Sequence, residues 1–392
     1  MALPLDGCRV LDLGIITAGA ATSALLADLG ADVIKVESPS YRDPFRGWSA
    51  SRAVGDQPTQ PFFAWTNRNK RGISLDLKHP EGRRAFLRLA ATSDIVVENF
   101  RRGVLERLGL DYSNLKAVNR EVILASISSA GETGPDAGHV SYGTTLEAVS
   151  GLAWSSGYAD GEPVVSGRDL NYPDQVVAIF AAGMIVTAWR AKRAGAGGTH
   201  LDLAQRELTS FLCGEAFVES GAQGASTRTG NAQEPYPLQD CFRSIDGLWL
   251  AVTVDAASAA AVAELVGDAS RDPTDRFRDW CGGQTADAAI ARLRRAGIAA
   301  GPALTGKELL QDAGRLWSFA LERAPDGQLL KGFPFQLRNT PLSIKRHAPA
   351  IGADTAEVLA TLGGFSASEI AALTRDGVVE LADGSAQENR NP

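Results

Sequence analysis

One acidic residue stands where the chain could position a nucleophile. Asp174 follows Pro173 at the start of a long apolar stretch that predicts a helix over residues 174–194. An aspartate at a helix start normally caps the helix, which stabilises it by about 1 kcal/mol. The positive end of the helix dipole also favours an ionised carboxylate there. Because a carboxylate in an apolar site can attack an activated acyl group, capping and nucleophilic catalysis are both open to Asp174.

Cationic residues lie close to the predicted ends of several strands in the first third of the chain. They are Arg42, Arg46, Lys70, Arg71, Lys78 and Arg107. Most charges of this kind in proteins are solvated at the surface. Open α/β sheets, however, bind ligands at the carboxyl edge of their strands. Several of these side chains could therefore hold the phosphate groups of a ligand.

Motifs for several other chemistries are missing from the sequence. It contains no G-x-S-x-G elbow, no P-loop and no H-E-x-x-H, and its scattered histidines predict no metal site. The first strand, turn and helix look like a dinucleotide-binding unit. The turn at residues 14–19 lacks the G-x-G-x-x-G glycines, which disfavours a nicotinamide or flavin cofactor. His139, in a glycine-rich turn, either lies at the surface or contacts substrate.

The composition is that of an acidic globular protein. The 392 residues include 39 Lys and Arg against 46 Asp and Glu, a net charge of −7, which argues against nucleic-acid binding. We expect no membrane partner, because the longest apolar helix, residues 176–189, is short for a span and no signal peptide is evident. We expect a cytoplasmic protein with reduced thiols, since no C-x-x-C pair occurs among Cys8, Cys213, Cys241 and Cys281.

The elements that must position these residues alternate between strand and helix. Strands are predicted over residues 9–13, 32–37, 72–77, 94–98 and 122–127, and helices over 18–29 and 80–91. This alternation predicts an α/β fold with a parallel sheet. The apolar helix at 174–194 should be buried, and a further helix is expected over 204–221. A hairpin turn at Asp246–Gly247 opens a smaller α+β unit, and helices over 353–362 and 366–375 close the chain.

Segments along nearly the whole chain resemble, in order, the family III CoA-transferases. This superfamily includes formyl-CoA transferase, the carnitine CoA-transferases and α-methylacyl-CoA racemase. Each segment is short, and their ordered combination makes the resemblance specific. The matching stretches are residues 5–7, 10–12, 30–37, 69–78, 97–103, 106–110, 131–135, 172–174, 297–302 and 362–363.

The resemblance implies a Rossmann-like large domain, with a parallel sheet completed by the C-terminal segment, and a smaller α+β domain. The implied boundaries are 1–224 for the first part of the large domain, 225–325 for the small domain and 326–392 for the returning segment. It also implies an interlocked homodimer. The implied substrates are an acyl-CoA donor and a carboxylic-acid acceptor, so coenzyme A is a substrate and no cofactor is tightly bound.

The same resemblance places the family's nucleophile on Asp174, which would form an aspartyl–acyl anhydride as CoA leaves. Lys78 and Arg107 suit phosphate oxygens, because they supply charge-assisted hydrogen bonds. No metal ligand is implied. Contacts to CoA fall on the matching positions Thr17, Ala18, Leu75, Lys78, Asn99, Phe100, Arg107 and Tyr142.

Two departures from the family pattern leave alternatives open. Position 17 is threonine where formyl-CoA enzymes often carry glutamine, which weakens an assignment to formyl-CoA or oxalate. A racemase would carry histidine at the position of Tyr142, and the nearest histidine is His139. One alternative is therefore a racemase or epimerase that exchanges the α-proton of an acyl-CoA between Asp174 and His139. The other is a CoA-binding subunit of a heteromeric transferase.

Overall fold

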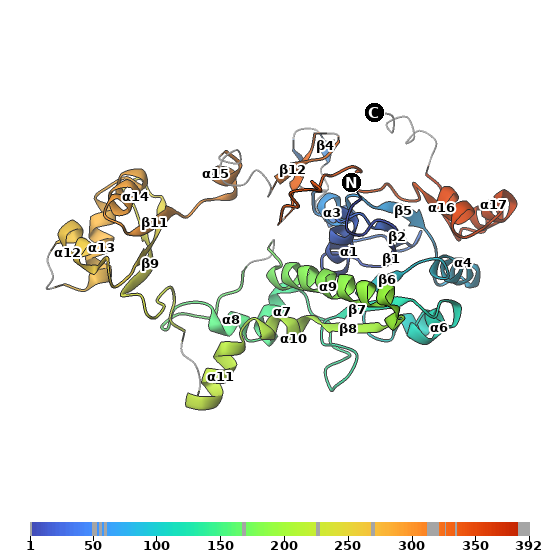
Figure 1. The fold of residues 1–392 in the computed structure, drawn as a ribbon, viewed down its shortest axis with the longest axis horizontal. Helices are drawn as coiled ribbons and strands as arrows, with labels where there is room; N and C mark the ends of the chain where they lie inside the picture. Colours follow the sequence, from blue (N-terminus) through green and yellow to red (C-terminus); the bar gives the residue numbers. More distant parts are fainter. Residues whose placement is uncertain are drawn as a thin grey trace. The chain divides into compact units, whose positions relative to one another are not determined.

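The computed structural model describes residues 2–48, 53–54, 57–58, 61–166, 170–224, 228–267, 271–311, 321–325, 327–333 and 335–382. The chain divides into two compact units (Figure 1). The first comprises Met1–Ser150, Ser166–Leu212 and Phe319–Pro392, and the second comprises Gly151–Val165 and Cys213–Ser318. These divisions fall at other residues than the sequence-based boundaries after 224 and 325.

A six-stranded sheet forms the centre of the first unit, and all of its strand pairs are parallel, as predicted. Its strand order is that of dinucleotide-binding α/β domains, where ligands bind outside the carboxyl ends at the point where the order reverses. That point lies here between β1 and β6 (Figure 1). In spatial order the strands are β5 (Arg71–Ser74), β2 (Asp32–Glu37), β1 (Arg9–Asp12), β6 (Ile95–Glu98), β7 (Ile123–Ser128) and β8 (His200–Ala204).

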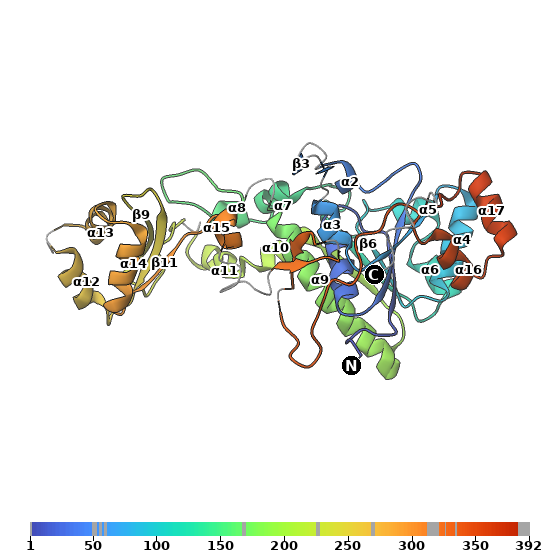
Figure 2. The ribbon, with the colours of Figure 1, turned by 90° about the horizontal axis from the view of Figure 1, so that it is seen from above.

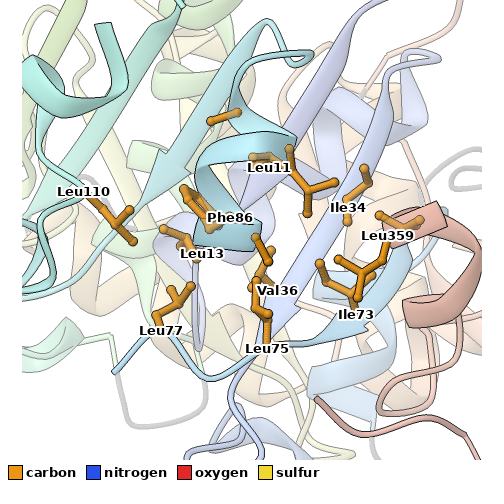
Figure 3. Packing of buried hydrophobic residues seen from close by; sticks show 14 of the residues in the cluster. Leu11, Leu13, Ile34, Val36, Ile73, Leu75, Leu77, Phe86, Leu110 and Leu359 are labelled. Atoms are coloured by element: carbon orange, nitrogen blue, oxygen red, sulfur yellow. The ribbon is translucent and has the colours of Figure 1, made fainter. Parts of the chain in front are cut away.

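Alternate side chains of these strands enter two hydrophobic cores, one on each face of the sheet. Leu11 and Ile34 belong to the first core, where Leu359 packs from α16 (Figure 3). Val10 and Val33 belong to the second core, which α1 and α9 cover. Burial on both faces is typical of parallel sheets. It leaves the carboxyl edge of the sheet as the place where polar side chains can gather.

Helices of the first unit connect the strands and cover both faces. Two short strands, β3 (Ala53–Val54) and β4 (Gln57–Pro58), form a separate antiparallel pair. The helices before the C-terminal segment are α1 (Ala18–Asp28), α2 (Phe45–Trp48), α3 (Pro61–Asn67), α4 (Pro80–Ala90), α5 (Val104–Leu108), α6 (Tyr112–Val118), α7 (Gly143–Val149), α9 (Tyr172–Ala191) and α10 (Gln205–Phe211).

The C-terminal segment returns to the first unit but adds no strand to the six-stranded sheet in the part of the chain described. The backbone N–H of Gly72 donates to Asp354 (2.8 Å), and that of Ser74 donates to Thr355 (2.9 Å). Two side chains and the backbone N–H of Asp354, which donates to the carbonyl of Gly72 (2.8 Å), thus bond the free edge of β5. This corrects the expectation that the segment completes the sheet. Its elements are β12 (Leu321–Arg323), β13 (Leu329–Lys331), α16 (Thr355–Thr361) and α17 (Ala367–Arg375).

Helix α9 is buried on one face only. Val177 and Ile185 pack in the second core, whereas Ile179 and Phe180 are 55% and 43% exposed. The expectation that the whole helix is buried is therefore wrong for the single chain, because α1 covers one side. Together with the π-helical turn η1 (Lys192–Ala196), α9 is the one helix of the described residues long and apolar enough to cross a membrane. Core helices meet the same criterion.

The chain after α9 differs from the predicted single helix over 204–221. Strand β8 pairs with β7, α10 follows directly, and a turn at Leu212 separates α10 from α11 (Gly214–Gln223). The signal for the strand was present, because Leu201 and Leu203 alternate with polar residues. The position of α10 beside the end of β7 follows from this strand.

The second unit is an α+β structure around a three-stranded antiparallel sheet with the order β11-β10-β9. The predicted hairpin turn at Asp246–Gly247 joins β9 to β10. The core of the second unit includes Phe242 and Phe277. Helices α12, α13 and α14 lie beside the sheet (Figure 2). Its elements are α8 (Leu152–Ser155), α11, β9 (Leu238–Arg243), β10 (Trp249–Val254), α12 (Ala259–Val266), α13 (Pro273–Gly282), α14 (Ala286–Arg295), β11 (Ala299–Pro302) and α15 (Gly306–Gln311).

Candidate active site

A cleft of about 1270 Å³ lies in the first unit at the carboxyl edge of the sheet. The segments that follow β1, β2, β5, β6 and β7 line it, so it occupies the point where the strand order reverses. Pockets for drug-sized ligands usually measure about 300–1,000 Å³. This cleft therefore has room for a larger, extended ligand.

Asp174 lines the cleft from the first turn of α9. The helix begins at Tyr172 behind the N-cap residue Asn171, so the capping role considered for Asp174 is wrong. The backbone N–H of Ala18, the first residue of α1, donates to the Asp174 carboxylate. Burial outweighs this hydrogen bond and raises the pKa of Asp174 to about 6. At neutral pH the carboxylate is therefore ionised and poorly solvated, which suits a nucleophile.

The start of α7 lies against the same carboxylate. A Cβ atom on Gly143 would lie 3.3 Å from Asp174 Oδ2 and 3.0 Å from Asn171 Oδ1, so a glycine allows this approach. The first turns of α1, α7 and α9 thus converge on one side chain. Each helix start carries a positive partial charge. These partial positive charges favour the ionised form of Asp174. They do so without a cationic side chain, which would neutralise the carboxylate.

Asn99 fixes the β1–α1 loop that presents Ala18 to the carboxylate. Its Oδ1 accepts from the backbone N–H of Ile15 (2.8 Å), and its Nδ2 donates to the carbonyl of Ile15 (3.0 Å). A Cβ atom on Gly19 would lie 2.7 Å from Asn99 Oδ1, so the packing requires glycine there. Asn99 therefore lines the cleft and also positions the loop.

Two fully buried lysines support this loop from within the core. Lys35 donates to the carbonyl of Gly14 (2.7 Å) and to Asp43 (2.9 Å). Lys70 donates to Asp12 (2.8 Å), and burial lowers the pKa of Lys70 to about 8. The sequence analysis considered Lys70 as a phosphate ligand. The structure corrects this, because its ammonium group is enclosed and paired.

The cleft has a cationic wall, formed by segments after β5 and β6. Most of the other candidate cations are used elsewhere: Arg46 pairs with Glu37 (2.5 Å) and Arg42 with Glu380 (3.3 Å). Free cations form charge-assisted hydrogen bonds with phosphates. The cleft thus offers an anion site on an acidic protein. The wall residues, none of which forms an ion pair within the described ranges, are Lys78, Arg83, Arg101, Arg102 and Arg107.

Most of the predicted site residues meet in this cleft. Thr17 and Ala18 are buried and do not line it, although Ala18 reaches Asp174 through its N–H. His139 is exposed and lines the cleft, and its Nδ1 lies 3.5 Å from Asp136 Oδ1. The predicted residues that line the cleft together with Asp174 are Leu75, Lys78, Asn99, Phe100, Arg107 and Tyr142.

Other residues of the cleft were missed by the sequence analysis. Gly143 begins α7, Ser128 ends β7 and Gln205 begins α10. The end of a parallel strand is a signal that could have found Ser128. Gln205 could not be found in this way, because β8, which places it beside Ser128, was not predicted.

Metal ligands and reactive thiols do not gather in the described part of the structure. No group of three or more His, Cys, Asp or Glu residues is placed there to hold a metal ion. The four cysteines are free. Burial raises the pKa of Cys8 to about 12 and that of Cys281 to about 11, so both thiols are protonated at neutral pH.

The chain is similar to known CoA-transferases along nearly its whole length. The model of CoA-transferase family III matches residues 5–355. The chain is 31% identical to succinyl-CoA–D-citramalate CoA-transferase of Chloroflexus aurantiacus over 96% of its length and 98% of the relative. It is 31% identical to succinate–glutarate CoA-transferase of Agrobacterium fabrum over 92% of its length and 96% of the relative. A solved CAIB/BAIF family protein from Brucella suis superposes with a TM-score of 0.82 at 28% identity, covering 92% of this chain and 100% of that one. The chain therefore belongs to CoA-transferase family III and is an enzyme of the CoA-transferase class.

Proposed function

We propose that this enzyme moves CoA between carboxylic acids through an anhydride formed on Asp174. The observation that carries the proposal is the pairing of two features in one cleft. Asp174 is poorly solvated and lies in the first turn of α9 beside the starts of α1 and α7, and a wall of unpaired cations lines the same cleft. A CoA thioester has matching chemistry, since its phosphates are anionic and its thioester is a neutral electrophile.

The reaction needs no group beyond the two substrates and Asp174. A carboxylate oxygen of Asp174 attacks the thioester carbonyl carbon, the C–S bond breaks, and CoA leaves as a thiolate. The thiolate attacks the aspartyl carbonyl of the resulting anhydride, which releases the first acid and leaves Asp174 as a CoA thioester. The acceptor carboxylate then attacks the carbonyl carbon of this thioester, the C–S bond breaks, and a second anhydride and the CoA thiolate form. The thiolate attacks the acceptor's carbonyl carbon in this anhydride, which yields the new acyl-CoA and frees the Asp174 carboxylate. Asp174 is regenerated with no net transfer of protons or electrons.

The cationic wall supports binding of CoA in one orientation. Lys78 follows β5, and Arg107 lies in α5, so both belong to segments that leave the carboxyl edge of the sheet. Their unpaired charges suit phosphate oxygens. Phosphates held there would leave the thioester arm free to extend to Asp174, which the size of the cleft permits.

Trapping of the intermediate tests the proposal. The protein is mixed with a panel of acyl-CoAs, treated with hydroxylamine and analysed by peptide mass spectrometry. We expect a hydroxamate on Asp174 with the true donors, and none in the Asp174→Ala variant although that variant still binds CoA. Turnover retained in Asp174→Ala, or no adduct with any donor despite CoA binding, would remove the anhydride proposal.

A second candidate is acyl-CoA racemisation, because Asp174 and His139 line the same cleft and could exchange an α-proton. Deuterium uptake at the α-carbon of an acyl-CoA, without any acceptor acid, would support it. The wide exposure of His139 and its contact with Asp136 favour the transferase. Activity that appeared only on adding a second, different chain would instead support the heteromeric alternative.

We further propose that the exchanged acids are dicarboxylic. Two relatives that match nearly the whole chain are named for succinyl-CoA with D-citramalate and for succinate with glutarate. Succinyl-CoA and glutaryl-CoA should therefore be included in the trapping panel as first donors. Transfer to monocarboxylic acids alone would contradict this choice.

A homodimer is the proposed assembly, in the interlocked form that the resemblance implies. The exposed apolar side chains of α9, with Phe211 of α10 at 75% exposure, support a protein partner on this part of the first unit. Light scattering during size exclusion should then report twice the chain mass of 41.3 kDa. We also propose a cytoplasmic location. All four cysteines should then be present as reduced thiols in the cell.

A further inference from the structure

Two buried polar side chains of the cleft have no hydrogen-bond partner among the described residues. They are Ser128, through Oγ, and Gln205, through Oε1. Ser128 is 8% exposed and Gln205 is 6% exposed. An unpaired buried polar group costs about 1–3 kcal/mol, so native proteins seldom retain one without a use for it.

The sheet brings the backbones of these two residues close together. Ser128 is the register partner of Ala204 in the β7–β8 pair, and Gln205 follows Ala204 directly. The backbone N–H of Arg206 donates to the carbonyl of Ser129 (3.0 Å), which joins the start of α10 to the end of β7. The two groups therefore share one corner of the cleft on rigid elements.

Neighbouring serines show that Ser128 is a special case. Ser126 lies on the same face of β7 and shares a hydrogen bond with His200 Nε2 (3.0 Å). The Oγ of Ser129 accepts from the backbone N–H of Ser141 (3.0 Å). Serine hydroxyls on both sides are thus hydrogen-bonded within the protein, whereas that of Ser128, which also belongs to the cleft lining, has no partner among the described residues.

This corner is linked to the reaction centre through α7. Ser141, bonded to Ser129, stands just before the helix, and Gly143 at its start approaches Asp174. Helix α10 also packs against both α7 and α9. An acid attached to Asp174 would therefore extend within the same part of the first unit as Ser128 and Gln205.

We propose that Ser128 and Gln205 bind a hydroxyl group on the acid that exchanges CoA, so that the enzyme selects hydroxycarboxylic acids. The inference rests on the proposed function. A hydroxyl both donates and accepts, and can therefore pair with the amide oxygen of Gln205 and the hydroxyl of Ser128 at once. A carboxylate only accepts and would leave Gln205 Oε1 unpaired, and the unpaired cations of the cleft come from other segments, after β5 and β6.

Acceptor acids that differ only by a hydroxyl test this subsite. With one fixed acyl-CoA donor, kcat/KM is measured for succinate against both enantiomers of malate, glutarate against 2-hydroxyglutarate, and butyrate against 3-hydroxybutyrate. We expect the wild type to prefer the hydroxylated member in at least one pair. Gln205→Met and Ser128→Ala should each reduce that preference roughly tenfold, the equivalent of about 1.4 kcal/mol.

Thr209→Val is the matched control, because Thr209 does not line the cleft and its hydroxyl donates to the backbone carbonyl of Gln205 (2.8 Å), not to the Gln205 side chain. It should leave the preference unchanged. An unchanged preference in Gln205→Met, no preference in the wild type, or an equal loss for both members of a pair would overturn the subsite. These outcomes leave the hydroxamate on Asp174 intact, whereas its absence in the wild type would refute the proposed function itself.

Discussion

Replacing Asp174 with asparagine should abolish CoA transfer and at the same time stabilise the folded protein. Asparagine has nearly the same size, and its amide oxygen can still accept from the N–H of Ala18. It carries no charge and cannot form the anhydride. Removal of a catalytic nucleophile costs about 10⁴-fold or more in turnover. A residue that only supported the fold would show loss of activity together with loss of stability.

The gain in stability follows from the raised pKa. Burial shifts the pKa of Asp174 from 3.8 to about 6, so the folded protein disfavours the ionised form. This difference corresponds to about 3 kcal/mol in the fully buried limit. Because the carboxylate is partly accessible from the cleft, solvent screening reduces the figure, and we expect about 1–2 kcal/mol.

The sign of the effect fixes its pH dependence. The pKa is higher in the folded than in the unfolded protein, so the cost of the ionised carboxylate is complete above about pH 6 and absent below about pH 4. The variant should therefore be more stable than the wild type by the full amount at pH 8, by a smaller amount at pH 5, and not at all at pH 4. Chemical denaturation at these pH values measures the difference.

Asp202→Asn serves as the control, because Asp202 lies in β8 and does not line the cleft. Its free energy of unfolding should not gain on that of the wild type as the pH rises from 4 to 8. A destabilised Asp174→Asn variant at pH 8, or a gain of the same size at every pH, would refute the description of Asp174 as a poorly solvated carboxylate. Turnover within tenfold of the wild type in Asp174→Ala would refute its role as nucleophile.

Three further predictions concern the cleft. The acid limb of kcat/KM should have its midpoint near pH 6, since activity requires ionised Asp174, and a midpoint near pH 4 would contradict this. Lys78→Ala and Arg107→Ala should each raise the KM for acyl-CoA about tenfold with little change in kcat. The rise in KM should be larger at low salt. Arg84 lies outside the cleft, so Arg84→Ala should change neither KM nor kcat. Asn99→Ala should lower kcat about tenfold or more while the protein remains folded, because Ile15 loses both partners and the loop no longer presents Ala18; a change in KM alone would show that Asn99 only contacts CoA.

Local patterns sufficed to predict five of the six strands, because short runs that contain Val, Ile or Leu alternate with helical stretches in the first part of the chain. Asp32–Glu37 was predicted to the residue, and Arg9–Asp12 within one. The sixth strand, His200–Ala204, was missed although Leu201 and Leu203 alternate with polar residues, because it is short and lies between two helical stretches. The C-terminal segment was expected to extend the sheet, yet its polar side chains bind the edge of β5.

Long-range pairs explain why the site was predicted only in part. The nucleophile candidate could be chosen from a local motif and a resemblance. The supports of the β1–α1 loop could not, because Asn99 is 84 residues from Ile15 and Lys70 is 58 residues from Asp12. A lysine or asparagine that is buried by such a partner looks like a surface residue in the sequence. The same reasoning applies to α7, whose start arises from a glycine- and serine-rich stretch without helical periodicity.

The G-x-G-x-x-G motif is missing from a fold whose strand order is that of dinucleotide-binding domains, and the loop after β1 shows why. In dinucleotide-binding domains, the start of the helix after the first strand holds the ligand's pyrophosphate. Here the N–H of Ala18 at that start donates to Asp174, an anion of the chain itself. The glycines that remain serve close packing, since Gly14 and Gly19 lie against each other and Asn99 fills the space beside them. A ligand phosphate must therefore bind elsewhere, and the unpaired cations after β5 and β6 provide that place. The familiar strand order thus separates the proposed anion site from the carboxylate of Asp174, as the proposed transfer from a long thioester requires.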